Sequence, residues 1–135
     1  MGEVERGLLD TSILIARDEE PSIVSDFPPE TTISVATLAE LHYGVLTAKD
    51  DLTRHRRLIR LGAIEASFHP LPIDSAVARA FGMVSHAVKI IGRQPRSRTM
   101  DLLIASTALV YKLPLYTRDA DDFNGLQNLI EVRVI

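Results

Sequence analysis

Short apolar runs alternate with longer segments of helical periodicity along this chain of 135 residues. Apolar and β-branched runs predict strands at "RGLLD", "TTISV", "HPLPI", "PLYT" and "IEVRVI". Apolar residues spaced three and four apart predict helices in "ATLAELHYGVLTAK", "DLTRHRRLIRLGAIEASF", "DSAVARAFGMVSHAVKIIG" and "TMDLLIASTALVYKL". Residues 11–17 are expected to form a brief further helix. Strands that alternate with helices predict an α/β protein with a largely parallel five-stranded sheet.

No internal repeat, low-complexity tract or linker divides the chain, so we predict a single domain over residues 1–135. Apolar residues make up 46% of the sequence, which is enough for a full hydrophobic core. The chain has no cysteine, which excludes disulfides and thiolate-bound metals. The first residues lack a signal-peptide pattern, and the longest apolar run is about half a bilayer span. We therefore expect a cytoplasmic protein without a membrane segment.

Four acidic residues stand at the ends of predicted elements, and each has an ordinary structural explanation. Asp10 follows the first strand, where it would cap the next helix. Glu40 matches a capping box with Thr37. Asp101 lies in the first turn of its helix, where the helix dipole favours an acid. Asp119 follows the fourth strand, where an Asx turn would account for it.

The predicted topology brings these four carboxylates to one edge of the sheet. Asp10 and Asp119 directly follow strands, and ligands of open parallel sheets bind beyond the carboxyl ends of the strands. Glu40 lies in the early turns of a helix that leaves the same edge. Asp101 begins the helix that runs back to the opposite edge before the fourth strand. All four are therefore expected to converge on one rim.

Convergence changes the chemistry that these residues favour. Carboxylates close together repel one another, and their pKa values rise unless a cation compensates. Without cysteine or a suitably spaced histidine pair, the ligands are all oxygen, which favours Mg²⁺ or Mn²⁺ over Zn²⁺. Such a centre suits phosphodiester hydrolysis by metal-activated water, with no covalent nucleophile.

The net charge of −3 hides local basic clusters. The loop "GRQPRSR" runs into the Asp101 helix, so its arginines and one beside Asp119 would flank the acidic rim. These candidate contacts to the phosphates of a nucleic acid are Arg93, Arg96, Arg98 and Arg118. Arginines in "RHRRLIR" are most simply explained as a solvated helix face. Few aromatic residues are present, which argues against extended stacking of bases along a single strand.

Four segments together resemble the PIN domain, and within it the VapC-type toxin ribonucleases of toxin–antitoxin pairs. They are "LLDTSILI", "ISVATLAELHYGV", "RTMDLLIASTAL" and "LYTRDADDF", in the family's order and spacing. The resemblance spans nearly the whole chain. It implies a three-layer α/β/α domain and a Mg²⁺- or Mn²⁺-dependent endoribonuclease. The implied catalytic and metal-binding acids are Asp10, Glu40, Asp101 and Asp119.

The resemblance also assigns supporting residues. Asp122 occupies the second acidic position of the last motif, and the choice between Asp119 and Asp122 as fourth ligand stays open. Ser12 and Thr117 would hydrogen-bond the metal ligands or metal-bound water without binding the metal themselves. As toxin of a type II pair, the protein would cleave structured RNA such as tRNA or rRNA and thereby inhibit translation and growth.

The implied partners are the RNA substrate, a second copy of the chain in a homodimer, and a VapB-type antitoxin. The antitoxin of the family places a C-terminal segment across the site, while its N-terminal part binds operator DNA. Contact with DNA is therefore expected only through the antitoxin.

Two other functions compete with the nuclease. A non-catalytic PIN-like RNA-binding module would typically lack one or more acids, and here all four are present. An aspartate-based phosphatase is suggested by "DTS" after a strand, but the haloacid-dehalogenase pattern needs a second aspartate where Ser12 stands. Metal-dependent RNA cleavage that is lost in Asp10→Ala would separate the nuclease from both.

Overall fold

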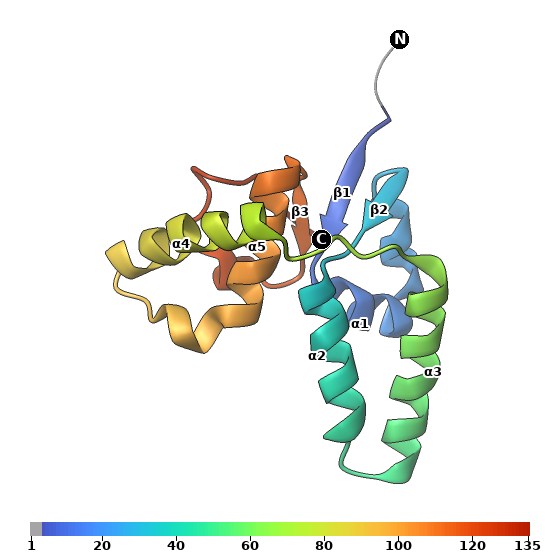
Figure 1. The fold of residues 1–135 in the computed structure, drawn as a ribbon. Coiled ribbons are helices and arrows are strands. Elements are labelled where there is room, and N and C mark those ends of the chain that lie inside the picture. Colours follow the sequence, from blue (N-terminus) through green and yellow to red (C-terminus); the bar gives the residue numbers. More distant parts are fainter. Residues whose placement is uncertain (1–3) are drawn as a thin grey trace.

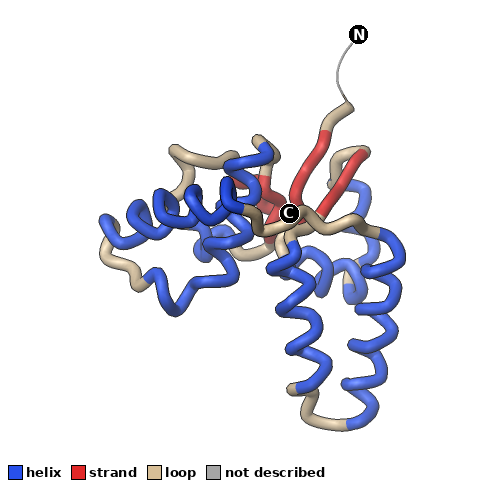
Figure 2. The backbone as a smooth tube through the Cα atoms, viewed as in Figure 1, coloured by secondary structure: helices blue, strands red, loops and turns tan. Residues whose placement is uncertain are grey.

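Four short parallel strands form the sheet in the computed structural model, which describes residues 4–135. Residues 1–3 of the predicted domain lie outside the described residues. The strand order is β2-β1-β3-β4, and every adjacent pair is parallel. Helices lie on both sides of the sheet (Figures 1 and 2). The strands are β1 (Arg6–Leu9), β2 (Glu30–Thr32), β3 (Leu115–Thr117) and β4 (Val132–Val134).

Side-chain caps define where three of the main helices begin. Ser34, Asp50 and Asp74 each accept a hydrogen bond from a backbone N–H in the first turn of α2, α3 and α4. None of the helices in residues 4–135 is both long and apolar enough to cross a membrane. The helices are α1 (Thr11–Glu19), α2 (Val35–Leu46), α3 (Asp51–Ser67), α4 (Ser75–Ile90) and α5 (Thr99–Tyr111), with 3₁₀ turns η1 (Pro21–Asp26), η2 (Pro95–Arg98) and η3 (Ala120–Phe123).

Alternation along the strands divides the interior into two cores. Leu8 and Leu115 face the core made with α4 and α5, whereas Leu9 and Tyr116 face the core made with α1, α2 and α3. Successive residues of a strand point to opposite faces, so two adjacent leucines serve both layers. The predicted three-layer α/β/α fold is therefore confirmed.

One of the five predicted strands, "HPLPI", is wrong. Only Leu71 pairs, in a single bridge with Ser34, through bonds from Leu71 N–H to Ile33 O and from Val35 N–H to Leu71 O. Its neighbours Pro70 and Pro72 have no N–H to donate, so the bridge cannot extend into a ladder. The sheet consequently has four strands.

The strand order creates a switch point between β1 and β3. The chain leaves β1 towards β2 on one side, and later returns to place β3 on the other side of β1. Connections that leave neighbouring strands in opposite directions open a crevice at the carboxyl edge, where ligands bind. The residues directly after β1 and β3 lie at this crevice.

A pair of helices extends away from the sheet. Helices α2 and α3 lie side by side and project from it in Figure 1. Leu61 and Ile64, in the last part of α3, are buried in the core with Leu41 and Val45 of α2. Thr53, Arg56 and Arg57, in the first part of α3, border a space beside α1 and α2.

Candidate active site

Asp10 is the innermost acid of the site. It directly follows β1, and its side chain is buried at the carboxyl edge, with only 3% of the residue exposed. Its Oδ2 accepts hydrogen bonds from Ser12 Oγ at 2.7 Å and Thr117 Oγ1 at 2.9 Å. Burial raises the pKa of Asp10, while these two hydroxyls favour the charged form and lower it. Ser12 and Thr117 thus orient the carboxylate and support its charge.

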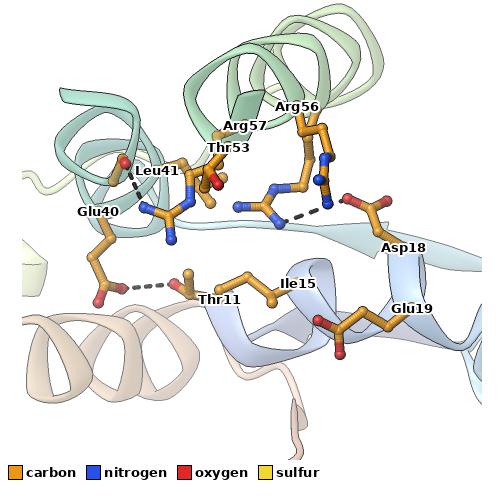
Figure 3. A pocket seen from close by; sticks show the side chains of 11 residues that line it. Thr11, Ile15, Asp18, Glu19, Glu40, Leu41, Thr53, Arg56 and Arg57 are labelled. Atoms are coloured by element: carbon orange, nitrogen blue, oxygen red, sulfur yellow. Dashed lines mark hydrogen bonds and ion pairs between the residues drawn. The ribbon is translucent and has the colours of Figure 1, made fainter. Parts of the chain in front are cut away.

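Glu40 reaches the same edge from α2. Thr11 donates a hydrogen bond to Glu40 Oε1 at 2.6 Å, drawn in Figure 3. The cap of α2 is Ser34, whose Oγ accepts from Ala36 N–H. Thr37 is buried inside the helix, 3.0 Å from the Thr11 hydroxyl, so the capping-box interpretation of Glu40 is wrong. The Glu40 side chain is held by Thr11 instead of capping its own helix.

Asp101 arrives in the first turn of α5. The helix begins at Thr99, one residue after its cap position at Arg98, and the Thr99 hydroxyl bonds Arg96 O. Asp101 and Glu40 line the same cavity of about 320 Å³, together with Arg96 and Arg98. Acidic and basic side chains thus share one opening at the edge of the sheet.

The two acids after β3 are placed differently. Asp119 is exposed, and its backbone N–H donates to Thr117 Oγ1 at 2.9 Å. Asp122 is half-buried on η3, and its Oδ1 lies 3.6 Å from an Arg98 nitrogen. The 3₁₀ turn of η3 separates the two carboxyl groups, so they do not have equivalent positions.

Electrostatic coupling identifies which acids form a cluster. Burial, followed by the charges of Asp122, Asp10 and Glu40, raises the pKa of Asp101 to about 7, against a smaller lowering by Arg98. Burial and the charges of Asp10 and Asp122 likewise raise the pKa of Glu40. The acid of the last motif that acts on the other three is thus Asp122.

The donor chemistry fits a hard divalent cation. The clustered groups are carboxylates supported by hydroxyls. Burial first, and then repulsion between the acids, raises their pKa values, and a bound cation would offset both effects. Within residues 4–135, no three acidic or histidine side chains already enclose a common point at ligand distance.

The four predicted phosphate-binding arginines divide into two groups. Arg96 and Arg98 line the cavity beside Glu40 and Asp101. Arg98 Nη1 also lies 3.6 Å from Asp122 Oδ1. The other two arginines pair with acids that do not line this cavity. Arg93 donates to Asp121 O at 2.6 Å and to its Oδ1 at 3.0 Å, whereas both terminal nitrogens of Arg118 contact Glu20, at 3.2 and 3.3 Å.

Sequence reasoning misses two features of this region. The role of Thr11 is signalled only by its place between Asp10 and Ser12, where every side chain is polar. Arg56, Arg57 and Arg60 are expected on a solvated face, but they line a cavity that also reaches Glu40. No local pattern indicates this, because it depends on how α3 folds against α1 and α2.

Comparison with known proteins gives one consistent family. The PIN domain family matches residues 7–128. Ribonuclease VapC8 of Mycobacterium tuberculosis H37Rv is 37% identical over 107 residues, covering 79% of this chain and 94% of that protein. Ribonuclease VapC5 of the same strain is 36% identical over 130 residues, covering 96% of this chain and 93% of that protein.

Solved structures agree with these sequence relatives. The crystal structure of VapBC-5, a VapBC toxin–antitoxin system from Mycobacterium tuberculosis, contains a similar chain, with a TM-score of 0.78 and 37% identity. The match covers 96% of this chain and 97% of that chain. FitAcB from Neisseria gonorrhoeae also matches, with a TM-score of 0.73 and 26% identity over 93% of this chain and 94% of that chain.

Proposed function

This chain belongs to the PIN domain family, within its VapC group, and from that premise we propose that it is a metal-dependent endoribonuclease. The main support for the proposal is the electrostatic coupling of Asp10, Glu40, Asp101 and Asp122 at the carboxyl edge. Relatives named as ribonucleases supply the substrate class. The reaction is hydrolysis of an RNA phosphodiester bond.

Asp10, Glu40 and Asp101 would hold Mg²⁺ or Mn²⁺, with Asp122 and Asp119 as candidates for the fourth carboxylate. Such an ion supplies charge stabilisation at a phosphate oxygen and activates water. Ser12 and Thr117 keep Asp10 oriented and favour its charged form. Thr11 does the same for Glu40. The residues that touch these ligands therefore set the geometry before RNA arrives.

Substrate binding falls to the basic side of the same opening. Arg96 and Arg98 line the cavity with Glu40 and Asp101, so a phosphate entering it would meet guanidinium groups beside the acids. The chain has no tryptophan and only 5% aromatic residues, which favours folded RNA, such as tRNA or rRNA, over a long stacked strand.

The biological role that we propose is that of the toxin in a VapBC-type pair, acting in the cytoplasm and inhibiting translation by RNA cleavage. The similar structures are described as VapBC toxin–antitoxin assemblies, which supports a VapB-type antitoxin as partner. A homodimer is part of the same proposal. Contact with DNA would arise through the antitoxin, since a similar VapBC complex is described as bound to DNA.

The test is cleavage of total cellular RNA by the purified chain, freed of any antitoxin, with Mg²⁺ or Mn²⁺ and with EDTA. Discrete new RNA ends that vanish in EDTA and in Asp101→Asn are expected. The rate should fall on the order of 100-fold or more in that variant. Cleavage that persists in EDTA, or RNA left intact by folded protein, would overturn the proposal.

A paired comparison identifies the fourth acid. Asp122→Asn should reduce the cleavage rate strongly, because the charge of Asp122 acts on all three other acids. Asp119→Asn, which removes the same charge from an exposed position three residues away, is the matched variant. A larger loss in Asp119→Asn would assign the fourth position to Asp119.

A further inference from the structure

Helices α1, α2 and α3 enclose a second cavity of about 500 Å³, which we call the arginine cleft. Its volume is within the range of small-ligand pockets. Thr11 and Glu40 belong to its wall, so it opens directly from the acidic site (Figure 3). Its other charged wall residues include Asp18, Arg56, Arg57 and Arg60.

The guanidinium of Arg60 is incompletely satisfied. Its side chain is only 19% exposed, and its buried Nε has no hydrogen-bond partner among residues 4–135. The nearest carboxylate oxygen, on Asp18, lies 3.7 Å from an Arg60 nitrogen, beyond normal hydrogen-bond length. Because Nε itself is buried, an anion in the cleft would contact the terminal nitrogens of Arg60, whose ion pair with Asp18 is long.

The neighbouring arginines also have donors to spare. Arg57 uses one terminal nitrogen to donate to Gly44 O at 2.7 Å, and Arg56 is exposed at the mouth of the cleft. In Figure 3 the Arg57 guanidinium lies on the side of Glu40 and Thr11, whereas that of Arg56 lies on the side of Asp18. An anion would therefore bind at the α3 wall, where a fork of donors suits phosphate oxygens.

Arg54 shows that position, not helix α3 alone, matters. It pairs with Asp51 at 2.8 Å and donates to Ala48 O at 3.3 Å, and it does not line the cleft. Arg54 and Arg56 thus carry the same charge on the same helix, but only Arg56 faces the cavity that reaches Glu40.

We propose that the arginine cleft binds a backbone phosphate of the RNA substrate next to the one that is cleaved, through Arg56, Arg57 and Arg60. This inference rests on the proposed nuclease function and extends it. An RNA strand with one phosphate at the acids must continue along the surface, and the cleft begins at Glu40. RNA is favoured over an acidic protein segment because the cleft shares Thr11 and Glu40 with the cleavage site.

The experiment measures binding of a fluorescein-labelled RNA 12-mer of mixed sequence by anisotropy, in Mg²⁺ at several salt concentrations. Asp101→Asn is the background, so that the RNA stays intact. Arg56→Gln and Arg57→Gln are each expected to weaken binding about five- to tenfold. Each should reduce the slope of log K against log salt by about 0.7. Arg54→Gln is the matched control and should change neither quantity.

Cleavage of total RNA by the otherwise wild-type chain separates the two proposals. If RNA is cleaved but both cleft variants bind the 12-mer like Arg54→Gln, the cleft does not bind RNA, and the proposed function still stands. If the cleft variants bind RNA normally but no longer hold a protein that co-purifies with the wild type, the cleft binds that protein and not RNA, and the proposed function still stands. If RNA is neither bound nor cleaved, the proposed function fails, and the inference fails with it. Thermal unfolding confirms that each variant is folded.

Discussion

Two opposing effects meet at the Asp10 carboxylate. Burial raises its pKa and would favour the neutral acid, whereas the Ser12 and Thr117 hydroxyls stabilise the charged form. A neutral carboxyl group is a poor ligand for a divalent cation, so these two hydroxyls matter more for function than for folding.

Removing the Ser12 hydroxyl tests whether it matters more for function than for folding. Ser12→Ala should lower the RNA cleavage rate about 10- to 100-fold, because Asp10 loses a donor to Oδ2. The free energy of unfolding should change by no more than about 1.5 kcal/mol. Cleavage assays and urea unfolding measure the two effects. Ser25→Ala, which removes a hydroxyl bonded to Ser22 O on the exposed surface, is the control. Equal cleavage in the two variants would contradict the role of Ser12.

Asp101 makes the metal-free protein sensitive to pH. Its pKa is raised to about 7 in the folded protein, by burial and by three acids, from about 3.9 in an unfolded chain. Between these values the unfolded chain releases a proton that the folded protein retains. The free energy of unfolding in EDTA should therefore fall as pH rises from about 4 to about 7.

Urea unfolding in EDTA at pH 5 and pH 7.5 measures this dependence. The Asp101 contribution is on the order of 1 kcal/mol once solvent screening of the half-exposed carboxyl group is allowed for. Asp101→Asn should flatten the dependence and make the metal-free protein more stable at pH 7.5. Stability that rises with pH over this range would refute the clustering of acids.

At the scale of elements, the end of α5 is set by one unusual backbone position. Lys112 follows the helix with φ of 54°, in the left-handed region, and its N–H reaches back to Ala108 O and Leu109 O. Glycine occupies such a position without the steric cost that other residues bear.

Lys112→Gly should therefore stabilise the protein by about 0.5–1 kcal/mol, because it relieves this backbone strain. Lys89→Gly, inside the last turn of α4, is the matched variant and should destabilise by about 1 kcal/mol. Urea unfolding compares them, and destabilisation of the same size in both would argue against the left-handed cap.

The sequence predicts elements well where local signals are strong. Helix α4 runs from the Asp74 cap towards Gly92 as its pattern indicates, and β1 ends at Leu9, directly before Asp10. The prediction fails where two candidate cap residues lie close together in the sequence. Ser34 and Thr37 are both plausible caps, and only the buried contact of Thr37 with Thr11 decides between them. The apolar pattern also predicts a strand at "HPLPI", where proline blocks pairing.

The sequence predicts the part of the site that follows from the order of strands and helices. Parallel strands fix Asp10 at the carboxyl edge, and the order of helices brings Glu40 and Asp101 to it. The coupling of Asp122 depends on the 3₁₀ turn of η3, and the arginine cleft depends on the packing of α3 beside α1. Such contacts arise from side-chain packing between distant segments, which no local pattern records.

At the scale of the whole molecule, the two cores hold the carboxyl edge in place from both sides. Leu8 and Leu9 anchor β1 in both layers, directly before Asp10. The acids come from different elements, so only the folded chain assembles them, and a cation bound there would stabilise the folded state.

Calorimetric titration of the purified chain with Mn²⁺ at pH 7.5 tests whether the acids at the carboxyl edge form one metal site. We expect saturable binding to the wild-type chain and at least about tenfold weaker binding to Asp10→Asn, Glu40→Gln and Asp101→Asn. Glu65→Gln, on an exposed acid paired with His42, should bind as the wild type does. Equal affinity in all of these variants would show that the carboxyl edge is not a metal centre.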